Sequence, residues 1–375
     1  MEREQQGHDG KDIHRCDIVI WMNQPSHYQT VFFRELASRP DVTLQVFYGT
    51  GLPSARRELG WSSFAEEVFP QRILGGRLDA MREAWRNRRA VHMINGLWSV
   101  PAFVLVSLLL WLVGARFYFH SERPNPAKER RGLWREIKRI WIRVMFLRAR
   151  GIFVIGRAAT EAFVDMGVPS KKVVPFLYFT NPGPPRLENP RVFTVCYVGQ
   201  FVARKRVEDL LAAFARLRLS NPDARLILIG AGPLRGSYEA FVEQHLLHEA
   251  VSIAGALPPE QVKESIRTAS VLVLPSEFDG WGLTVNEALQ SGVPVVCSDG
   301  CGAAELLEDH PEWGAVFSRG DVDTLTRLLE RIAEGSLATN IDLNEVEAVI
   351  GPRAVTDRFL EVIRSGSGVL RDRKA

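Results

Sequence analysis

The chain has 375 residues, more than one ordinary hydrophobic core holds, so two compact domains are expected. Hydrophobic residues make up 46% of the chain and charged residues 24%, which excludes an intrinsically disordered or fibrous protein. The formal net charge is only +3, but positive charge is concentrated in one segment of the first half.

The first 15 residues are polar and lack the apolar run of a secretory signal, so we expect a disordered tail and a cytoplasmic protein. The four cysteines lie in or near apolar, strand-like runs or in short loops, and we expect free thiols. No second pair or histidine cluster follows the last two cysteines, which argues against a metal site there. These cysteines are Cys16, Cys196, Cys297 and Cys301.

The first half of the chain alternates strand-like and helix-like segments. Short runs of β-branched and aromatic residues are separated by amphipathic stretches of helical length. Continuous apolar strands of this kind predict a parallel sheet that is covered by helices on both faces. The runs are 17–21, 42–47, 116–119 and 151–155.

Residues 99–114 form the most apolar stretch and raise the question of a membrane span. The stretch has 16 residues, fewer than the roughly 20 that a bilayer core requires, and Pro101 lies near its start. A helix buried between the strands is therefore expected.

Residues 123–150 carry ten Lys and Arg against two Glu, a net charge of +8 that leaves about −5 for the rest of the chain. Within them, residues 133–148 have helical periodicity, with basic residues around an apolar stripe and with two tryptophans seven residues apart. An anionic surface such as a membrane fits this segment better than nucleic acid does. A solvated helix face, with its aromatic residues in the core, is the alternative. The stripe is Leu133, Ile137, Ile140, Val144 and Leu147; the basic residues are Arg135, Lys138, Arg139 and Arg143; the tryptophans are Trp134 and Trp141.

The proline-rich stretch 179–190 predicts an interdomain linker, placed at 181–190. The strand pattern restarts after it, so the domains are expected at 16–180 and 191–350, with a C-terminal helix in 351–375 that crosses back to the first domain. Two doubly wound α/β domains follow from this pattern, with ligands in the cleft at the carboxyl ends of their strands. The second series of strand runs is 192–199, 225–230, 251–255, 270–275 and 293–298.

The most informative run is residues 274–300, where an apolar strand leads through a glycine-bearing loop into a helix. Gly280 and Gly282 let the backbone approach a ligand closely. Free amides of the first helical turn, at Trp281, Leu283 and Thr284, can bind a diphosphate or a sugar hydroxyl.

Asp279 and Glu287 flank this loop with seven residues between them. Carboxylates only accept hydrogen bonds, so a pair of them suits the paired hydroxyls of a sugar ring and a ribose. The structural alternative is that Asp279 or Thr284 caps the helix and Glu287 is an ordinary helical residue.

This run resembles the E-x7-E element of family 4 glycosyltransferases, one of the group 1 glycosyltransferases, with Asp279 in place of the first glutamate. The resemblance implies the GT-B fold, two Rossmann-like doubly wound parallel-sheet domains that face each other across a cleft. It also implies that Asp279 and the adjacent amides hold the donor sugar and that Glu287 binds the ribose. The shorter Asp279 side chain leaves the choice of sugar open.

Residues 196–214 resemble the first strand and loop of the nucleotide domain of that family, with Gly199 and Gln200 in the loop. Arg204 and Lys205 follow, and two fixed cations can neutralise a departing diphosphate without a metal ion. Arginine often occupies the position of Gln200 in the family, so one phosphate contact is missing or comes from elsewhere.

Residues 226–241 are similar to the glycine-rich turn of the family, with Gly230 at a tight turn between strand and helix. The resemblance continues in order from residue 192 to 335. It implies that the backbone around Ala256 and Leu257 meets the nucleobase.

The first domain resembles the family only in pattern. The stretch 23–36 looks like an acceptor loop and helix without the usual glycine pair, and His27 is the candidate acceptor contact. His120 ends a strand and aligns with a histidine that lies near the donor sugar in the family.

Together these features predict a retaining glycosyltransferase that moves a sugar from a UDP- or GDP-sugar to a saccharide or lipid-linked acceptor in cell-envelope or exopolysaccharide biosynthesis. A nucleotide-sugar epimerase of the same fold and a noncatalytic nucleotide-sugar-binding subunit are the alternatives. No cofactor and no metal ion are expected, because Asp321, in the acidic pair Asp321 and Asp323, is predicted to cap a helix. A cytoplasmic protein, peripheral on the membrane, is expected.

Overall fold

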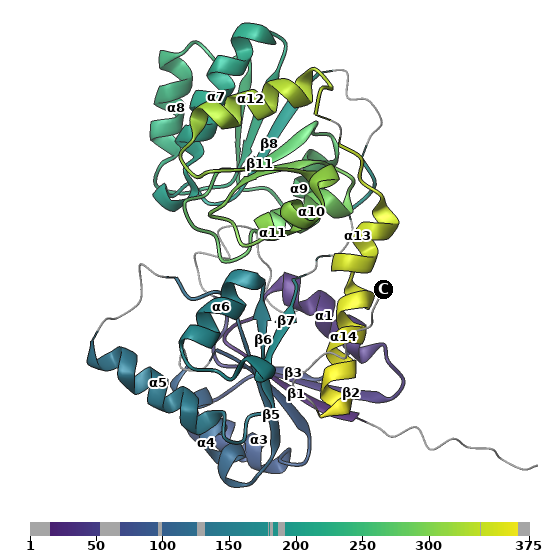
Figure 1. Cartoon of the computed structure of the whole chain (residues 1–375). Helices are drawn as coiled ribbons and strands as arrows, with labels where there is room; N and C mark the ends of the chain where they lie inside the picture. The colour runs from purple at the N-terminus through teal and green to yellow at the C-terminus, as the bar shows by residue number, and fades with distance from the viewer. Residues whose placement is uncertain are drawn as a thin grey trace, which may run out of the picture.

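The structure is a computed structural model that describes residues 16–52, 68–96, 100–125, 132–178, 180, 183–186, 192–337 and 339–366. Within these residues the chain forms two α/β domains, one above the other in Figure 1. Each domain has one parallel sheet with helices packed on both faces. The predicted fold class is confirmed: two doubly wound, Rossmann-like domains of the GT-B type.

The first domain is built on a seven-stranded sheet, within the described residues, in the order β3-β2-β1-β4-β5-β6-β7. Its strands are short, apolar and mostly buried on both faces, as a sheet between two helical layers requires. The strands are β1 (Cys16–Met22), β2 (Val42–Tyr48), β3 (Gln71–Ile73), β4 (Val91–Asn95), β5 (Arg116–Ser121), β6 (Gly151–Ile155) and β7 (Val173–Phe176). The helices are α1 (His27–Ala37), α3 (Arg77–Arg86), α4 (Pro101–Leu112), α5 (Leu133–Met145) and α6 (Arg157–Asp165), with a 3-10 turn η2 (Ser170–Lys172).

The second domain has a six-stranded sheet in its described part, in the order β10-β9-β8-β11-β12-β13. The strands are β8 (Thr194–Val198), β9 (Arg225–Ile229), β10 (Val251–Gly255), β11 (Val271–Leu274), β12 (Val295–Ser298) and β13 (Gly314–Phe317). The helices are α7 (Val207–Ser220), α8 (Arg235–Gln244), α9 (Pro259–Arg267), α10 (Leu283–Gln290), α11 (Ala304–Asp309), α12 (Val322–Ala333) and α13 (Leu343–Ile350), with 3-10 turns η3 (Ala203–Lys205) and η4 (Pro311–Trp313).

Each sheet changes winding direction at one place. The change lies between β1 and β4 in the first sheet and between β8 and β11 in the second. Loops that leave the carboxyl ends of such neighbouring strands run to opposite faces of the sheet and leave a crevice between them. The two crevices face each other, so the fold itself prepares a ligand site between the domains.

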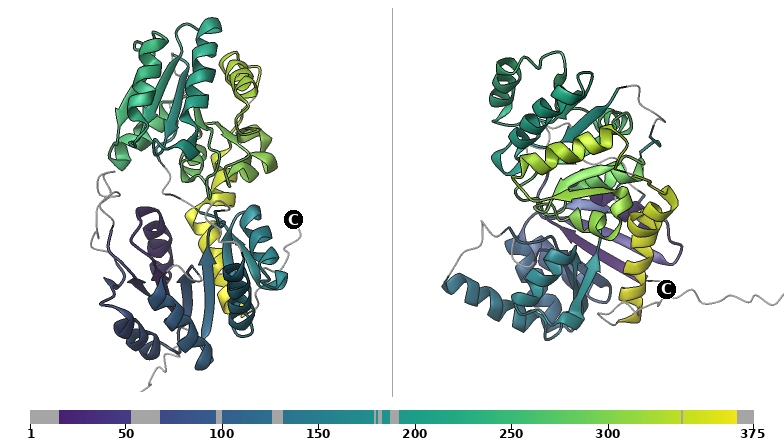
Figure 2. Two further views of the ribbon diagram at one scale, coloured as in Figure 1. Left: turned by 90° about the vertical axis from the view of Figure 1, so that its left-hand side faces the viewer. Right: turned by 45° about the horizontal axis from the view of Figure 1, so that its top comes forward.

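The last helix, α14 (Pro352–Ser365), follows α13 directly and packs against α1 of the first domain. Figures 1 and 2 show it as the yellow helix that runs from the second domain along the first. Phe359 packs edge-on against Phe32 of α1, with ring centroids 5.1 Å apart. The C-terminal helix therefore belongs to the core of the first domain. Most of the predicted linker 181–190 lies outside the described residues, as do the predicted tail 1–15 and the segment after residue 366.

The apolar stretch 99–114 forms α4, which packs Phe103, Val106 and Leu110 into the core. None of the helices in the described part is long and apolar enough to cross a membrane. Leu112 remains 67% exposed at the end of α4, so the helix is buried on one face only.

Several strands were absent from the sequence prediction: β3, β4, β7 and β13. The most important is β4, because it lies at the change of direction of the first sheet. Its sequence contains His92, which is buried and accepts a hydrogen bond from the Trp21 indole Nε1 at 3.1 Å. A histidine and a terminal asparagine interrupt the β-branched pattern that marks the other strands, which concealed β4.

Candidate functional site

A cavity of about 630 Å³ lies between the domains at the carboxyl ends of their strands. Its walls come from residues that follow β1, β4 and β5 in the first domain and β8 and β11 in the second. Of the residues predicted to act in catalysis, His120, Arg204, Lys205 and Asp279 line this cavity.

Lys205 and Asp279 form an ion pair at the floor of the cavity. Lys205 ends η3 after β8, and Asp279 lies in the loop after β11, the neighbouring strand. Their side chains are 10% and 17% exposed, so little water screens them. Arg204 lies beside them and donates a hydrogen bond to the Phe278 carbonyl at 3.1 Å.

The backbone at Arg206 holds Lys205 in place. Arg206 has φ 46°, in the left-handed region that side chains other than glycine and asparagine seldom adopt. Its guanidinium Nε donates to Asp209 at 2.6 Å, and its Nη1 lies 3.3 Å from a Glu277 carboxylate oxygen. These contacts stabilise the strained turn that directs Lys205 into the cavity.

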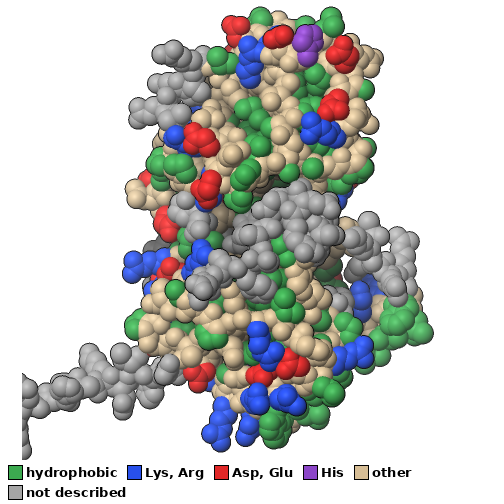
Figure 3. All heavy atoms as spheres, turned by 180° about the vertical axis from the view of Figure 1, so that it is seen from behind, with side chains coloured by type: hydrophobic (Ala, Val, Ile, Leu, Met, Phe, Trp, Pro, Cys, Tyr) green, Lys and Arg blue, Asp and Glu red, His purple; other side chains and the backbone are tan. Residues whose placement is uncertain are grey.

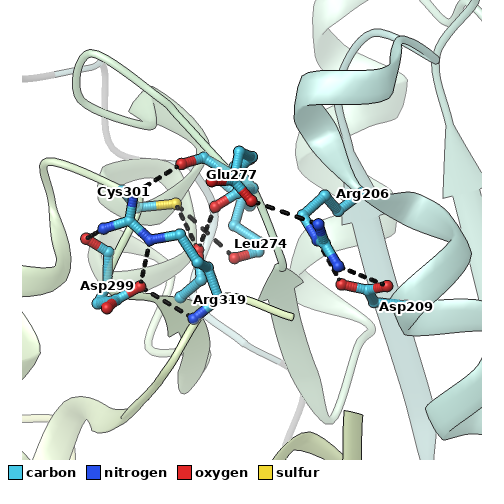
Figure 4. A network of polar contacts seen from close by, with 9 residues as sticks. Arg206, Asp209, Leu274, Glu277, Asp299, Cys301 and Arg319 are labelled. Atoms are coloured by element: carbon cyan, nitrogen blue, oxygen red, sulfur yellow. Dashed lines mark hydrogen bonds and ion pairs between the residues drawn. The ribbon is translucent and has the colours of Figure 1, made fainter. Parts of the chain in front are cut away.

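The loop after β11 is fixed by a second group of contacts, drawn in Figure 4 beside Arg206 and Asp209. Arg319 bonds the Asp299 carboxylate through Nε at 2.9 Å and the Glu277 carbonyl through Nη1 at 3.1 Å. The Cys301 thiol donates to the Leu274 carbonyl at 3.7 Å. The segment that carries Asp279 is thus tied to the strands on both sides before any ligand arrives.

Helix α10 points its amino end at the cavity. The helix begins at Leu283 after Gly282, which has φ 98° and no side chain, and no side chain caps this end. Gly282, Leu283 and Thr284 line the cavity wall. The free amides and the positive end of the helix dipole therefore face the same space as Lys205 and Arg204, an arrangement that binds an anion.

A narrower cavity of about 160 Å³ lies next to the main cavity. The two cavities share Gly199 and Gln200 in their walls. Six residues predicted to bind the donor lie in its wall, among them the three predicted to meet the nucleoside, Ala256, Leu257 and Glu287; the others are Gly199, Gln200 and Gly230. Its apolar wall and its size fit a flat ring next to a polar sugar.

Glu287 is on α10 and lines this narrower cavity. The residue is 8% exposed to solvent. Its Oε2 atom is buried and has no hydrogen-bond partner among the described residues. Burial raises the pKa of the Glu287 carboxyl to about 7, against a smaller opposing effect of Lys263. An unpartnered buried carboxylate oxygen beside a cavity is suited to accept a hydrogen bond from a ligand hydroxyl.

His120 lies at the end of β5 on the opposite wall. Its ring is buried, and its edges face Phe176 and Tyr178 at centroid distances of 5.7 Å and 6.3 Å. Burial lowers the pKa of His120 to about 4, so its imidazole is neutral at pH 7. Its Nδ1 atom is also buried without a partner in the described part of the chain. A neutral imidazole in this place can hydrogen-bond a ligand but does not supply positive charge.

Two residues of the glycine-bearing loop are placed differently from the sequence prediction. The helix begins at Leu283, two residues after Trp281, so Gly280 and Trp281 precede it and do not line either cavity. The Trp281 side chain is 2% exposed and donates from Nε1 to the Asn286 side chain at 2.7 Å. Asn286 in turn donates to the Tyr178 carbonyl at 2.6 Å. The Trp281 side chain therefore joins the donor loop, through Asn286, to the first domain.

The predicted acceptor contact, His27, begins α1, but its side chain lies outside the described residues. Asp321 caps α12 as predicted, since its carboxylate accepts the Thr324 amide at 2.9 Å. The described cysteines, Cys196, Cys297 and Cys301, are buried free thiols, as expected.

Several cavity residues of the first domain were missed by the sequence prediction: Asn23, Gln24, Tyr28, Asn95, Glu122 and Arg123. Asn95 is the last residue of β4, and the others follow the carboxyl end of β1 or β5. That position is a usable signal in a doubly wound sheet, but only once the strands are known. Because β4 was not predicted, Asn95 in particular could not be placed.

Residues 184–345 match the model of the family described as glycosyl transferases group 1. The match covers most of the second domain and confirms the resemblance to group 1 glycosyltransferases. The finer assignment to family 4 stays a prediction.

Two curated relatives match parts of the chain. The MMP alpha-(1->4)-mannosyltransferase of Mycolicibacterium hassiacum is 28% identical over 183 residues, which are 48% of this chain and 44% of that protein. The lipopolysaccharide 1,6-galactosyltransferase of Salmonella typhimurium is 28% identical over 166 residues, 43% of this chain and 44% of that protein. The chain thus spans less than half the length of each of these relatives.

Among solved structures, Anabaena HepE in complex with UDP superposes with a TM-score of 0.74 at 15% identity, over 93% of this chain and 100% of that one. At this identity the likeness concerns the fold alone. It extends over both domains, whereas the family match is confined to the second.

Proposed function

We propose that this chain is a retaining glycosyltransferase whose second domain binds a UDP- or GDP-sugar and whose first domain binds a saccharide or lipid-linked acceptor. The observation that carries the proposal is the grouping of two cations, the amino end of α10 and two carboxylates around one pair of connected cavities. The match of the second domain to group 1 glycosyltransferases supports it.

In this proposal the diphosphate of the donor lies against Arg204, Lys205 and the free amides at Leu283 and Thr284. The nucleoside occupies the narrower cavity, where the unpartnered oxygen of Glu287 accepts hydrogen bonds from the ribose hydroxyls. HepE has this fold and was crystallised with UDP, which supports a uridine nucleotide as the first donor to test.

The donor sugar then lies between Asp279 and His120, which line the main cavity from different domains. Asp279 accepts hydrogen bonds from sugar hydroxyls while it remains paired with Lys205. Neutral His120 lines the same cavity, and its buried Nδ1 atom has no partner among the described residues. The polar first-domain wall, with Asn23, Asn95 and Arg123, receives the acceptor.

The reaction we propose is a same-face substitution. The bond between the anomeric carbon and the phosphate oxygen breaks, and the acceptor oxygen bonds to that carbon from the same side. The acceptor proton passes to an oxygen of the departing diphosphate. Lys205, Arg204 and the α10 amides stabilise the negative charge that develops on the leaving group, so the protein needs no metal ion for that step.

We further propose that the protein works at the membrane surface in cell-envelope or exopolysaccharide biosynthesis. The apolar stripe predicted along residues 133–148 faces outward, because α5 packs on the domain through Ile142 and Met145 instead. Leu133 and Ile140 are 76% and 59% exposed. The relationship to a lipopolysaccharide galactosyltransferase supports an envelope acceptor.

The test is incubation with labelled UDP-glucose, UDP-galactose and GDP-mannose, followed by analysis of the nucleotide and the sugar. Release of nucleoside diphosphate with an α-linked product on an added acceptor supports the proposal. An epimerised donor would instead identify an epimerase, and nucleotide binding without any turnover would identify a noncatalytic subunit.

A further inference from the structure

A third cavity, of about 500 Å³, lies in the first domain, away from the cleft. Its wall comes from the turn before β5, the loop between α5 and β6, and η2 before β7. These segments stand at the amino ends of the strands, whereas the donor and acceptor cavities stand at their carboxyl ends. The two sites are therefore on opposite edges of the same sheet.

The wall of this cavity is basic. Of the described residues that line it, four are cationic and none is acidic: Arg148, Arg150, Lys171 and Lys172. Among the described residues, no carboxylate forms an ion pair with any of the four. Four unneutralised cations around one cavity repel each other, and an anion between them would relieve that repulsion.

Two of the cations are held in place by the backbone. Lys172 donates from Nζ to the Phe146 and Ala149 carbonyls at 2.6 Å and 2.8 Å. Arg148 donates to the Trp111 carbonyl at 2.9 Å and lies over the Trp111 ring at 4.8 Å. The pKa of Lys172 is lowered first by burial and then by the charges of Lys171 and Arg150. The site is thus partly preorganised for a negative group before one binds.

The surroundings of the cavity are apolar and exposed. Leu147, which lines it, is 72% exposed, and the outer face of α5 leads to it. Leu112 and Val113, at the end of α4, are 67% and 37% exposed next to the turn at Gly114 that also lines the cavity. In Figure 3, the right-hand edge of the lower, first domain carries hydrophobic and basic side chains together. A soluble phosphate needs no such apolar border, whereas a lipid headgroup is always accompanied by acyl chains.

We propose that this basic cavity binds the phosphate headgroup of an anionic membrane lipid while the outer face of α5 lies in the boundary between headgroups and acyl chains. The helix ends at Met145, two residues before Leu147 in the cavity wall, so its outer face leads to the headgroup site. The inference rests on the proposed membrane location but does not depend on glycosyl transfer.

The test is co-sedimentation of the full chain with vesicles of phosphatidylcholine, alone or mixed with phosphatidic acid. Wild-type protein should bind the mixed vesicles at least about tenfold more tightly than the neutral ones. Arg150→Glu with Lys171→Glu should remove that preference. A charge-matched control, Arg331→Glu with Arg353→Glu, alters exposed arginines far from the cavity and should retain at least most of it.

A second pair of variants separates the lipid from free phosphate. Leu133→Ser with Ile140→Ser removes apolar side chains of α5 and leaves the four cations, so it should weaken vesicle binding while retaining stabilisation by soluble glycerol 3-phosphate in a thermal-shift assay. Nucleotide binding in the cleft, measured with UDP, should be unchanged in every variant and verifies that each one folds.

The inference is overturned if the charge-reversed cavity variant binds mixed vesicles as wild type does. It is also overturned if the wild type is stabilised by inorganic phosphate but prefers no vesicle, because the cavity is then a site for a free anion. Neither result bears on donor binding, so a failure of the proposed transfer reaction is recognised separately by the labelled-donor assay.

Discussion

Lys205 and Asp279, 74 residues apart in the chain, form an ion pair at the junction of two neighbouring strands of the second sheet. The pair lies where the diphosphate and the donor sugar meet in the proposed complex. A preformed pair keeps both side chains oriented. The ammonium group of the lysine still has N–H donors left for phosphate oxygens, and the aspartate still has lone pairs left to accept from sugar hydroxyls. Five predictions follow from this arrangement and its surroundings.

Lys205→Ala should lower kcat by about 10² to 10³, because one fixed cation is lost from the developing charge of the leaving group. The variant also leaves Asp279 with an unpaired, poorly solvated charge, which costs stability. The double variant Lys205→Ala with Asp279→Asn removes that cost and should recover the melting temperature without recovering turnover. Transfer by the single variant at near wild-type rate would refute the role of Lys205.

Glu287→Gln should make the ligand-free protein more stable at pH 8. Burial raises the pKa of Glu287 to about 7 from its ordinary value of 4.5, so between these values the folded protein keeps a proton that the unfolded chain has released. Stability contributed by this group is complete below pH 4.5 and is lost as the pH rises through 7, by up to about 3 kcal/mol. The amide stays neutral and avoids that loss.

Urea unfolding at pH 4.5 and pH 8 measures the effect, with the exposed Glu243→Gln on α8 as the matched control. The Glu287 variant should also bind UDP more weakly, because an amide replaces a carboxylate at the ribose. Equal free energies of unfolding for wild type and Glu287→Gln at pH 8 would contradict a raised pKa of the buried Glu287 carboxyl.

Gly230→Ala should destabilise the second domain by about 2 to 4 kcal/mol and reduce UDP binding. Gly230 has φ 147°, and a Cβ there would lie 1.8 Å from the Gly199 carbonyl oxygen, so the backbone that lines both donor cavities would have to move. Gly236→Ala is the control, since a Cβ at that helical position meets nothing within 4 Å. Calorimetry and UDP titration of both variants compare the two effects, and similar melting temperatures would exclude the clash.

Trp281→Phe should reduce the free energy of unfolding by about 1 to 3 kcal/mol. The buried Asn286 side-chain oxygen then loses the hydrogen bond that it accepts from the indole N–H. Since the indole does not line either cavity, the dissociation constant of UDP should change by less than about threefold. A large loss of UDP affinity with an unchanged melting temperature would instead show that the Trp281 side chain contacts the donor.

Prolonged treatment with a chelator should leave transfer unchanged. The leaving group is stabilised in the proposed reaction by Lys205, Arg204 and the α10 amides, and the acidic Asp321 is occupied as the cap of α12. Activity assays with and without EDTA provide the measurement. Strong inhibition that magnesium or manganese reverses would show that a metal ion takes part.

The sequence by itself determined the alternation of strand and helix, the restart after residue 190 and the ligand loops of the second domain. These features are local: a strand, a glycine turn and a helix start occupy consecutive residues, so their spacing can be read directly. For that reason Asp279, Glu287, Arg204 and Lys205 could be selected before their positions were known.

Only the tertiary structure decided which faces are covered and which residues meet. The apolar stripe of α5 was visible in the sequence, but Ile142 and Met145 on another face are also apolar, and only packing shows that these two enter the core. Trp281 lies beside the predicted ligand loop yet points to Asn286 and the first domain. Burial, pairing and the place of β4 in the sheet depend on partners tens to hundreds of residues away, and the spacing within one segment carries no information about them.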